Sequence, residues 1–322
     1  MKRILSRLLL AAAPAFLLAA HAPATAEAPP VKAQAPGFHR VRVGDFEVTA
    51  ISDGTIKLPV LQLLRGDPAQ LAAALKRGFL GEQVETSVNT YLVNTGSKLV
   101  LIDSGAGPLF GPTVGRLVEN LKSSGYKPEQ VDEVYITHLH GDHIGGVAAN
   151  GARAFPNAVL RLDKRDADYW LSEANLAAAP EQMKDFFKGA MLSVKPYAEA
   201  GKLKTFDGAT DLVPGVRAHP AYGHTPGHTV YTIESKGDKL VLWGDLMHVA
   251  AVQFDDPTVT IQFDSDSDAA RKQRLQAFED AARNGWMVGA AHLSFPGLGH
   301  LRAKSDGKGY VFVPLNYSSL AP

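Results

Sequence analysis

Residues 137–143 read Thr137-His138-Leu139-His140-Gly141-Asp142-His143, so three imidazoles and one carboxylate fall between His138 and His143. Imidazole nitrogens and carboxylate oxygens are the ligands that Zn²⁺ and similar divalent metals prefer. The two-residue spacing of His138 and His140 lets both rings turn the same way from an extended backbone. Asp142 and His143 can then face a second centre. The alternative is a solvated histidine-rich turn, which ligand-type residues later in the chain disfavour.

An apolar run precedes this cluster, and three further segments with ligand-type residues follow it. Residues 131–136 read Val131-Asp132-Glu133-Val134-Tyr135-Ile136, which predicts a buried strand with the cluster on the loop at its carboxyl end. The later segments are Gly223-His224-Thr225-Pro226-Gly227-His228-Thr229, Leu240-Val241-Leu242-Trp243-Gly244-Asp245 and Met287-Val288-Gly289-Ala290-Ala291-His292. Considered alone, Asp245 would be interpreted as a turn residue and His292 as a buried structural histidine. Their joint occurrence behind the first cluster indicates a metal centre.

The order of these segments resembles the signature of the metallo-β-lactamase fold superfamily, over about residues 40 to 300. The resemblance implies an α/β fold, namely an αββα sandwich in a single domain. It also implies two divalent metal ions per chain, with zinc the expected metal. In the implied ligand set, one metal is held by His138, His140 and His224, the other by Asp142, His143 and His292, and Asp245 bridges them. His228 is assigned a supporting role. Four histidines match no ligand position and are expected to support the ligands or lie at the surface: His39, His219, His248 and His300.

Two adjacent metals define the chemistry expected of such a site. A pair about 3.5–4 Å apart can form a hydroxide from a bridging water near neutral pH and polarise the oxygen of the electrophile. The expected catalytic carboxylates are Asp245, which fixes the spacing, and Asp142, which with Asp103 is a candidate for orienting the nucleophile or its histidine ligands. The chain contains no Gly-x-Ser-x-Gly elbow and no cysteine, which excludes serine-elbow hydrolysis, a cysteine nucleophile and Cys-ligated zinc.

The N-terminus predicts export. A basic stretch with Lys2, Arg3 and Arg7 precedes 13 uncharged, mostly apolar residues (8–20), a run too short to span a bilayer comfortably. Ala24-Thr25-Ala26 then offers a cleavage site, so residues 1–26 are interpreted as a signal peptide. Residues 27–36 are expected to be a flexible mature N-terminus and residues 37–322 the hydrolase domain. The expected location is periplasmic or secreted, with no membrane attachment after cleavage.

Charge and size restrict the partners. Removal of residues 1–26 takes away three of the 33 basic residues and none of the 33 acidic ones, so the mature chain carries 30 against 33, a net charge of about −3. A nucleic-acid partner would call for a basic face, so none is expected. Without cysteine the chain depends on its core for stability, and its length allows one large domain. The expected partner is a small-molecule substrate, and the sequence leaves a homodimer open.

The rest of the chain predicts alternating strands and helices. Strands are expected at residues 41–43, 46–51, 87–93, 98–102, 158–162, 230–234 and 239–243, with a hairpin turn at Asn94-Thr95-Gly96-Ser97. Helices are expected over 113–124 and near 164–173, 181–194 and 266–284. The run Asp264-Ser265-Asp266-Ser267-Asp268 resembles the opening of a calcium loop. Ala269 and Leu275 replace its required Gly and Glu, so these acidic residues are expected to cap the helix that follows.

Finer similarity bears on the substrate. Segments outside the ligand set resemble the methyl parathion hydrolase family of exported, organophosphate-degrading enzymes: Gly96-Ser97-Lys98-Leu99-Val100-Leu101, Leu109-Phe110-Gly111-Pro112-Thr113, Gln253-Phe254-Asp255-Asp256-Pro257, Phe295-Pro296-Gly297 and Gly307-Lys308-Gly309-Tyr310-Val311-Phe312-Val313-Pro314. That family lines its substrate pocket with apolar and aromatic groups, and the matching positions are Leu58, Phe110, Trp170 and Phe186, for which core packing is the alternative. The chain departs from the family at Gly141, where the family has Pro, and in the apolar run Leu61-Gln62-Leu63-Leu64.

These similarities predict a hydrolase of aryl organophosphate triesters. Two alternatives stay open. One is a lactonase or carboxylesterase, for example on acyl-homoserine lactones, because the same centre can attack a carbonyl. The other is a non-catalytic binding protein on a degenerate scaffold, which the complete ligand set disfavours.

Overall fold

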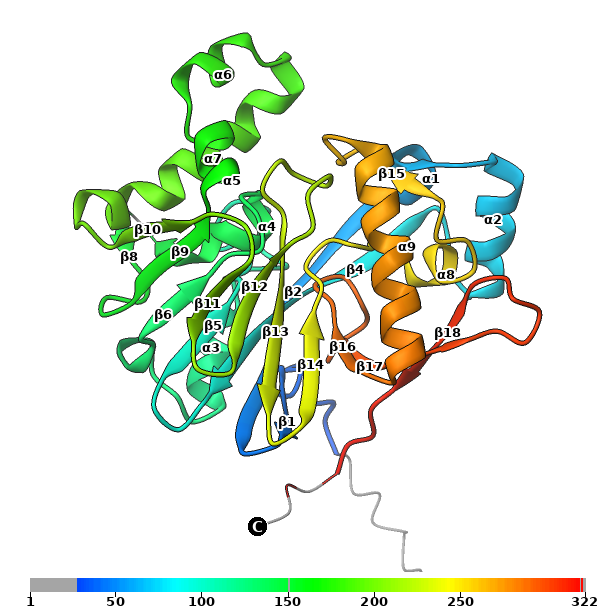
Figure 1. Cartoon of the computed structure of the whole chain (residues 1–322), viewed down its shortest axis with the longest axis horizontal. Coiled ribbons are helices and arrows are strands. Elements are labelled where there is room, and N and C mark those ends of the chain that lie inside the picture. The colour runs from blue at the N-terminus through cyan, green and yellow to red at the C-terminus, as the bar shows by residue number, and fades with distance from the viewer. Residues whose placement is uncertain (1–27, 150, 319, 321–322) are drawn as a thin grey trace, which may run out of the picture. The chain divides into compact units, whose positions relative to one another are not determined.

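The computed structural model describes residues 28–149, 151–318 and 320, so the expected signal peptide lies outside the described part of the chain. From Pro36 onwards, the described residues form one compact unit. Two seven-stranded sheets pack against each other, and helices cover the outer side of each sheet (Figure 1). This arrangement is the αββα sandwich that the sequence predicts. Among the helices of the described residues, none is long and apolar enough to cross a membrane.

Strands from the two halves of the chain build the two sheets. The first sheet has the order β1 (Phe38–Val43), β2 (Phe46–Pro59), β4 (Gln83–Asn94), β5 (Leu99–Ile102), β6 (Glu133–Tyr135), β9 (Val159–Asp163) and β10 (Leu203–Phe206). The second has the order β11 (Thr210–Val213), β12 (Val216–Pro220), β13 (Thr229–Ser235), β14 (Asp238–Leu242), β16 (Met287–Gly289), β17 (Leu298–Ala303) and β18 (Tyr310–Pro314). Two short pairs are separate: β3 (Leu64–Arg65) with β15 (Thr260–Ile261), and β7 (Ala148–Ala149) with β8 (Ala152–Arg153).

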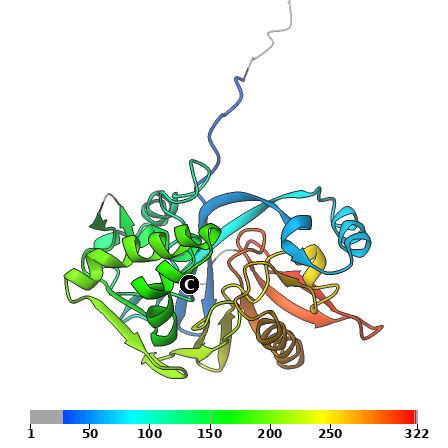
Figure 2. The same cartoon turned by 90° about the horizontal axis from the view of Figure 1, so that it is seen from above.

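The helices divide between the two outer faces (Figure 2). Those on the side of the first sheet are α3 (Leu117–Ser123), α4 (Gly141–Ile144), α5 (Lys164–Trp170), α6 (Glu173–Ala178) and α7 (Glu181–Glu199). The second sheet is covered by α9 (Ser267–Asn284). A further apolar cluster joins α1 (Val60–Leu63) and α2 (Pro68–Arg77) to the segment around α8 (Ala250–Gln253).

Side-chain alternation explains why a sheet can be buried on both faces. In β5, Leu99 and Leu101 pack in the cluster under the helices, whereas Val100 and Ile102 pack in the cluster between the sheets. A strand that buries both faces reads as a continuous apolar run rather than an alternating one. The apolar sequence of β5 is therefore the direct consequence of its central place in the sandwich.

Most predicted elements are confirmed, although several boundaries differ: β2 continues to Pro59 and α7 to Glu199, and one helix begins later than expected. The helix expected over residues 113–124 begins only at Leu117. The buried carboxylate of Asp53 accepts hydrogen bonds from the backbone N–H groups of Ala106 (2.8 Å), Gly115 (2.9 Å) and Leu117 (2.9 Å). Gly115 also has φ +83°, a conformation that a helix cannot contain. These contacts hold residues 106–116 as a loop, although the apolar spacing there is helical.

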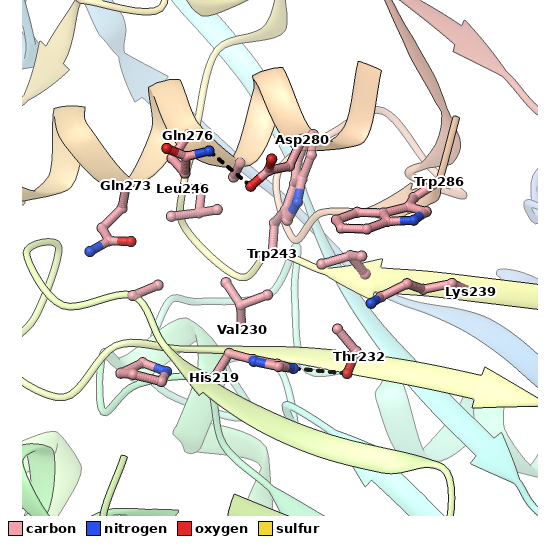
Figure 3. Close-up of a pocket in the computed structure, with 14 residues that line it drawn as sticks. His219, Val230, Thr232, Lys239, Trp243, Leu246, Gln273, Gln276, Asp280 and Trp286 are labelled. Carbon is pink, nitrogen blue, oxygen red and sulfur yellow. Dashed lines mark hydrogen bonds between the residues drawn. The ribbon is translucent and has the colours of Figure 1, made fainter. Parts of the chain in front are cut away.

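A cavity of about 250 Å³ separates α9 from the outer face of β12, β13 and β14 (Figure 3). Alternation along β13 directs Val230 and Thr232 towards this cavity. At its rim the Lys239 ammonium lies 4.3 Å from the centre of the Trp286 ring. None of the seven predicted metal ligands lines this cavity, so it is distinct from the candidate metal centre.

Candidate metal centre

The predicted ligands meet at one edge of the sandwich, where loops from both sheets come together. The cluster at 138–143 follows β6 of the first sheet, and Asp245 and His292 follow β14 and β16 of the second. The segment with His224 precedes β13, which runs antiparallel to β14, so its start lies at the same edge. The backbone N–H of Thr229 donates to Thr137 O over 2.8 Å and ties the two sheets together there.

Four of the ligands form a first buried group. His138, His140, His224 and Asp245 each offer a ligand atom, and these atoms all lie within 4.8 Å of one another. Asp245 Oδ2 lies 3.4 Å from His224 Nε2 and 3.6 Å from His138 Nε2. His224 Nε2 lies 3.1 Å from His140 Nδ1. The spacing suits one metal ion held by three imidazoles and a carboxylate.

A second group shares the same aspartate. Asp142, His143 and His292 also place ligand atoms within 4.8 Å of one another. Asp142 Oδ2 lies 3.6 Å from His143 Nε2 and 3.5 Å from His292 Nε2. The carboxylate of Asp245 reaches both histidines, with Oδ1 3.2 Å from His143 Nε2 and Oδ2 3.2 Å from His292 Nε2. Asp245 therefore lies between the two groups, in the position expected of a bridging ligand.

Hydrogen bonds fix the orientation of three of the rings. His143 Nδ1 donates to Asp103 Oδ2 (2.9 Å), His224 Nδ1 to Asp264 Oδ1 (2.8 Å) and His292 Nδ1 to Ser87 O (2.9 Å). Each bond leaves Nε2 directed at the shared space. Partners of this kind set the tautomer and angle of metal-binding histidines.

Buried atoms without partners show that the donor set fits divalent cations. His138 Nε2, His143 Nε2 and Asp245 Oδ1 are buried and have no hydrogen-bond partner among the described residues. Such atoms are costly to leave unpaired. Burial lowers the pKa of His138 well below its ordinary value and so favours the neutral imidazole that binds metals. Burial alone would raise the pKa of Asp245, but the surrounding histidines, His143 first, hold it well below its usual range.

His228 supports the centre without facing it. Burial and the neighbouring His224 lower the pKa of His228 to about 3, so its ring is neutral. Its Nδ1 donates to Ala221 O (3.2 Å), and its Nε2 accepts the backbone N–H of Asp245 (3.0 Å). The ring therefore fixes the backbone of Asp245, which agrees with the supporting role predicted for it. Gly244 permits this approach, because a Cβ there would lie 2.8 Å from His228 Nε2.

Three residues of the site were not predicted. His248, grouped with the histidines that match no ligand position, is buried, and its Nε2 lies 3.1 Å from Asp245 Oδ2. Asp264 was expected to cap α9, but Asp266 makes that cap and Asp264 binds His224. Asp166 is buried and accepts the backbone N–H groups of Leu139 (2.8 Å) and Gly227 (2.7 Å). The only sequence signal for His248 was its spacing three residues after Asp245.

One cavity lies at the centre, and a second shares two lining residues with it. One, of about 100 Å³, is lined by Leu58, Phe110 and Phe186 together with His140, Asp142, Asp245, His248, His292 and other apolar residues. The other, of about 340 Å³, shares Phe110 and Phe186 and extends along α7 to Leu192. Trp170, also predicted for the pocket, is fully buried, and its ring lies edge-to-face with that of His140, with centroids 5.3 Å apart. The structure thus places three of the four predicted pocket residues at the cavity and Trp170 behind a candidate ligand.

The chain belongs to the metallo-β-lactamase superfamily: residues 84–306 match that family. It is a metal-dependent hydrolase of this superfamily, as the match, the solved structures below and the histidine–aspartate groups together show. The resemblance inferred from the ligand motifs is confirmed at this level.

Two solved structures are similar over most of the chain. The hydrolase AbOPH of the β-lactamase superfamily is 36% identical, with a TM-score of 0.84 over 89% of this chain and 100% of that one. AidC, described as a dizinc quorum-quenching lactonase, is 30% identical, with a TM-score of 0.81 over 88% of this chain and 99% of its own. An N-acyl homoserine lactonase of Bacillus cereus is 30% identical over 50% of this chain and 56% of its own length. Another, from a Bacillus species, is 27% identical over 61% of this chain and 78% of its own.

Proposed function

We propose that this chain opens the lactone ring of N-acyl homoserine lactones. The observation that carries the proposal is the pairing of the two cavities. The smaller one, of about 100 Å³, has Asp142 and Asp245 on one side, and the larger, apolar one of about 340 Å³ shares its Phe110 and Phe186 walls. A small ring at the carboxylates with an acyl chain along the apolar cavity suits this shape.

The lining of the smaller cavity favours an uncharged electrophile. No lysine or arginine is among its lining residues, whereas apolar groups such as Leu58 and Phe263 are. A phosphate monoester or another anionic substrate would call for cationic side chains to pair with it. A neutral lactone requires none.

The seven ligands divide between the two proposed metals in the same way as they fall into two groups in the structure. His138, His140 and His224 would hold one metal, Asp142, His143 and His292 would hold the other, and Asp245 would be shared between them. Two divalent metals bound there would supply a nucleophile formed from water near neutral pH and would polarise the electrophile. Zinc is the proposed metal, since the ligands are imidazoles and carboxylates and AidC is described as a dizinc enzyme.

The chain's own residues keep this centre in position. Asp103, Asp264 and the Ser87 carbonyl orient three ligand rings, and His228 holds the backbone of Asp245. The similarity to lactonases supports the choice of substrate, and the similarity to AidC extends over 88% of this chain.

Hydrolysis of aryl phosphotriesters is the second candidate. The aromatic rings of Phe110, Phe186 and Phe263 line the smaller cavity and would accept an aryl group. A phenolate of low pKa also leaves without being protonated, and the carboxylates at the metals are committed as ligands. The same largely apolar cavity, which has no lysine or arginine in its lining, therefore suits both substrates.

Steady-state kinetics on the zinc-loaded protein separates the two candidates. We expect a higher kcat/KM for an N-acyl homoserine lactone than for a 4-nitrophenyl phosphotriester, and a value that rises with acyl-chain length. Unacylated homoserine lactone is the control, and its kcat/KM should be lower because it leaves the apolar cavity empty. Fast turnover of the phosphotriester without measurable lactone hydrolysis would transfer the assignment to the second candidate.

A further inference from the structure

Gly189 is the single glycine of the 19-residue helix α7, and it lines the cavity of about 340 Å³. Its neighbours along the helix divide between two faces. Phe187 and Ala190 are buried in the cluster between the first sheet and its helices, whereas Phe186 and Leu192 line the cavity together with Gly189. The three-residue spacing of Phe186, Gly189 and Leu192 keeps them on one side of the helix. Gly189 therefore lies in the middle of one cavity wall.

The backbone and the packing of α7 do not require a glycine at this position. The backbone of Gly189 is helical, and glycine is among the least favourable residues in a helix interior because it loses the most conformational freedom on folding. Among the described residues, a Cβ at position 189 would meet one atom within 4 Å, Leu109 Cδ1 at 3.4 Å, which is an ordinary van der Waals contact. At Gly145, by contrast, a Cβ would lie 2.2 Å from Ala106 O, so packing requires that glycine. Alanine would thus fit at position 189 and would suit the helix better.

The missing side chain of Gly189 leaves space in the cavity instead. Leu109 and Phe110, on the loop after β5, line the same cavity. Because Leu109 already lies at contact distance from a Cβ at position 189, a side chain longer than that of alanine would have to extend into the cavity. Interior space is normally filled by side chains, so a helix position that leaves it open calls for an occupant.

The lining of this cavity suits a linear, uncharged chain. Its two charged residues pair with each other, since Lys188 Nζ lies 3.2 Å from Asp185 Oδ1, and both side chains are exposed. The other lining side chains are apolar. Leu192 is 62% exposed, so a chain that extends past Gly189 would cover it. Burial of apolar surface of this kind is what favours the binding of a hydrocarbon chain.

We propose that Gly189 determines which acyl-chain lengths the protein accepts. Its missing side chain leaves room for the methylenes of a long acyl chain between Phe186 and Leu192, whereas a short chain ends before this point. The inference rests on the proposed lactone substrate and assigns the residue that selects its acyl chain. Gly189 lies outside the metal-ligand groups, so its replacement should change the preference for chain length and leave the metal centre intact.

The test compares Gly189→Ala and Gly189→Leu with the wild type, all loaded with zinc. The measurements are kcat/KM for N-butanoyl and N-dodecanoyl homoserine lactone, metal content per chain, and the urea midpoint of unfolding. Lys195→Leu is the matched control, because it adds a leucine to the same helix at an exposed position that lines neither cavity.

We expect Gly189→Leu to lower the ratio of kcat/KM for the dodecanoyl substrate to that for the butanoyl substrate by about tenfold or more. Each buried methylene contributes about fourfold to affinity, and a leucine side chain would displace several of them. Gly189→Leu should retain two metals and hydrolyse the butanoyl substrate like the wild type. Gly189→Ala should unfold at a higher urea concentration than the wild type. Lys195→Leu should leave the ratio unchanged.

A smaller fall of this ratio in Gly189→Leu would show that the acyl chain does not pass Gly189 and would overturn the proposal. A lower urea midpoint in Gly189→Ala would also overturn it, because the fold itself would then need the glycine. If the wild type opens no lactone, the proposed function fails separately. The variants are then compared on 4-nitrophenyl butanoate and 4-nitrophenyl dodecanoate, and the same ratio decides the role of Gly189.

Discussion

Asp166 links the two histidine loops of the site, and its replacement by asparagine should change the pH dependence of stability in a defined way. Its carboxylate accepts the backbone N–H of Leu139, between His138 and His140, and that of Gly227, next to His228. In Asp166→Asn, one amide oxygen remains as an acceptor, so one of the two N–H groups loses its partner and faces an NH₂ group.

The size of this pH effect follows from the burial of the Asp166 carboxylate. Burial raises the pKa of Asp166 from 3.8 to about 6. At about 1.4 kcal/mol per pKa unit, holding the ionised carboxylate in the fold costs about 3 kcal/mol above pH 6. Between pH 3.8 and 6 the native state binds more protons than the unfolded state, so this cost is relieved as the pH falls. Asp166→Asn removes this cost, but it leaves one buried N–H without a partner, which destabilises the fold by about 1–3 kcal/mol. At pH 8 these two effects on the free energy of unfolding nearly cancel.

Urea unfolding of metal-free wild type and Asp166→Asn, at pH 8 and at pH 4.5, measures this effect. We expect nearly equal free energies of unfolding at pH 8 and a relative gain for the wild type of about 2 kcal/mol at pH 4.5. The titration of the histidines is common to both proteins and cancels in the difference. In the zinc-loaded form, Asp166→Asn should lower kcat/KM about tenfold through the displaced loops. A difference in unfolding free energy that is the same at both pH values would show that the pKa of Asp166 is not raised in the folded protein.

Three further predictions concern the site itself. Asp245→Ala should retain fewer than two metals per chain and lose more activity than His228→Ala. Loss of a supporting residue such as His228 typically lowers activity about 10–100-fold. Equal metal content and activity in the two variants would contradict the ligand assignment. Gly141→Ala would place a Cβ 2.8 Å from Phe110 Cε2. We expect unchanged metal content and a KM for long-chain acyl lactones that is raised about fivefold, which corresponds to about 1 kcal/mol. If the dependence of KM on acyl-chain length does not change, Phe110 does not line the acyl-chain cavity. If aryl phosphotriesters are turned over, their rates should fall steadily as the pKa of the leaving phenol rises, and a flat series would show that leaving-group departure is not limiting.

The sequence predicts the meeting of the seven ligands because they lie on loops next to recognisable strands. The cluster at 138–143 follows β6, and Asp245 and His292 follow β14 and β16, which run parallel. Parallel strands bring their carboxyl ends to one edge of a sheet, so spacing along the chain translates into proximity. The αββα sandwich follows from the same strand pattern and from the family resemblance.

The parts that the sequence does not predict depend on tertiary contacts of irregular segments. His248 reaches the cavity because Gln253 and Arg274, neither of which belongs to a predicted ligand motif, hold the segment between β14 and α9. Asp264 belongs to an acidic run that reads equally well as a helix cap, and only the placement of His224 decides its role. The late start of α3 likewise depends on Asp53, more than 60 residues away in the chain.

Metal titration tests the central claim, a centre of two metals that share Asp245, most directly. Protein stripped of metal is titrated with Zn²⁺, and bound metal per chain and hydrolysis of the preferred substrate are measured on the same samples. Activity should reach its maximum only when two metals are bound per chain. Full activity with one metal per chain, or with none, would show that hydrolysis does not need a centre of two metals.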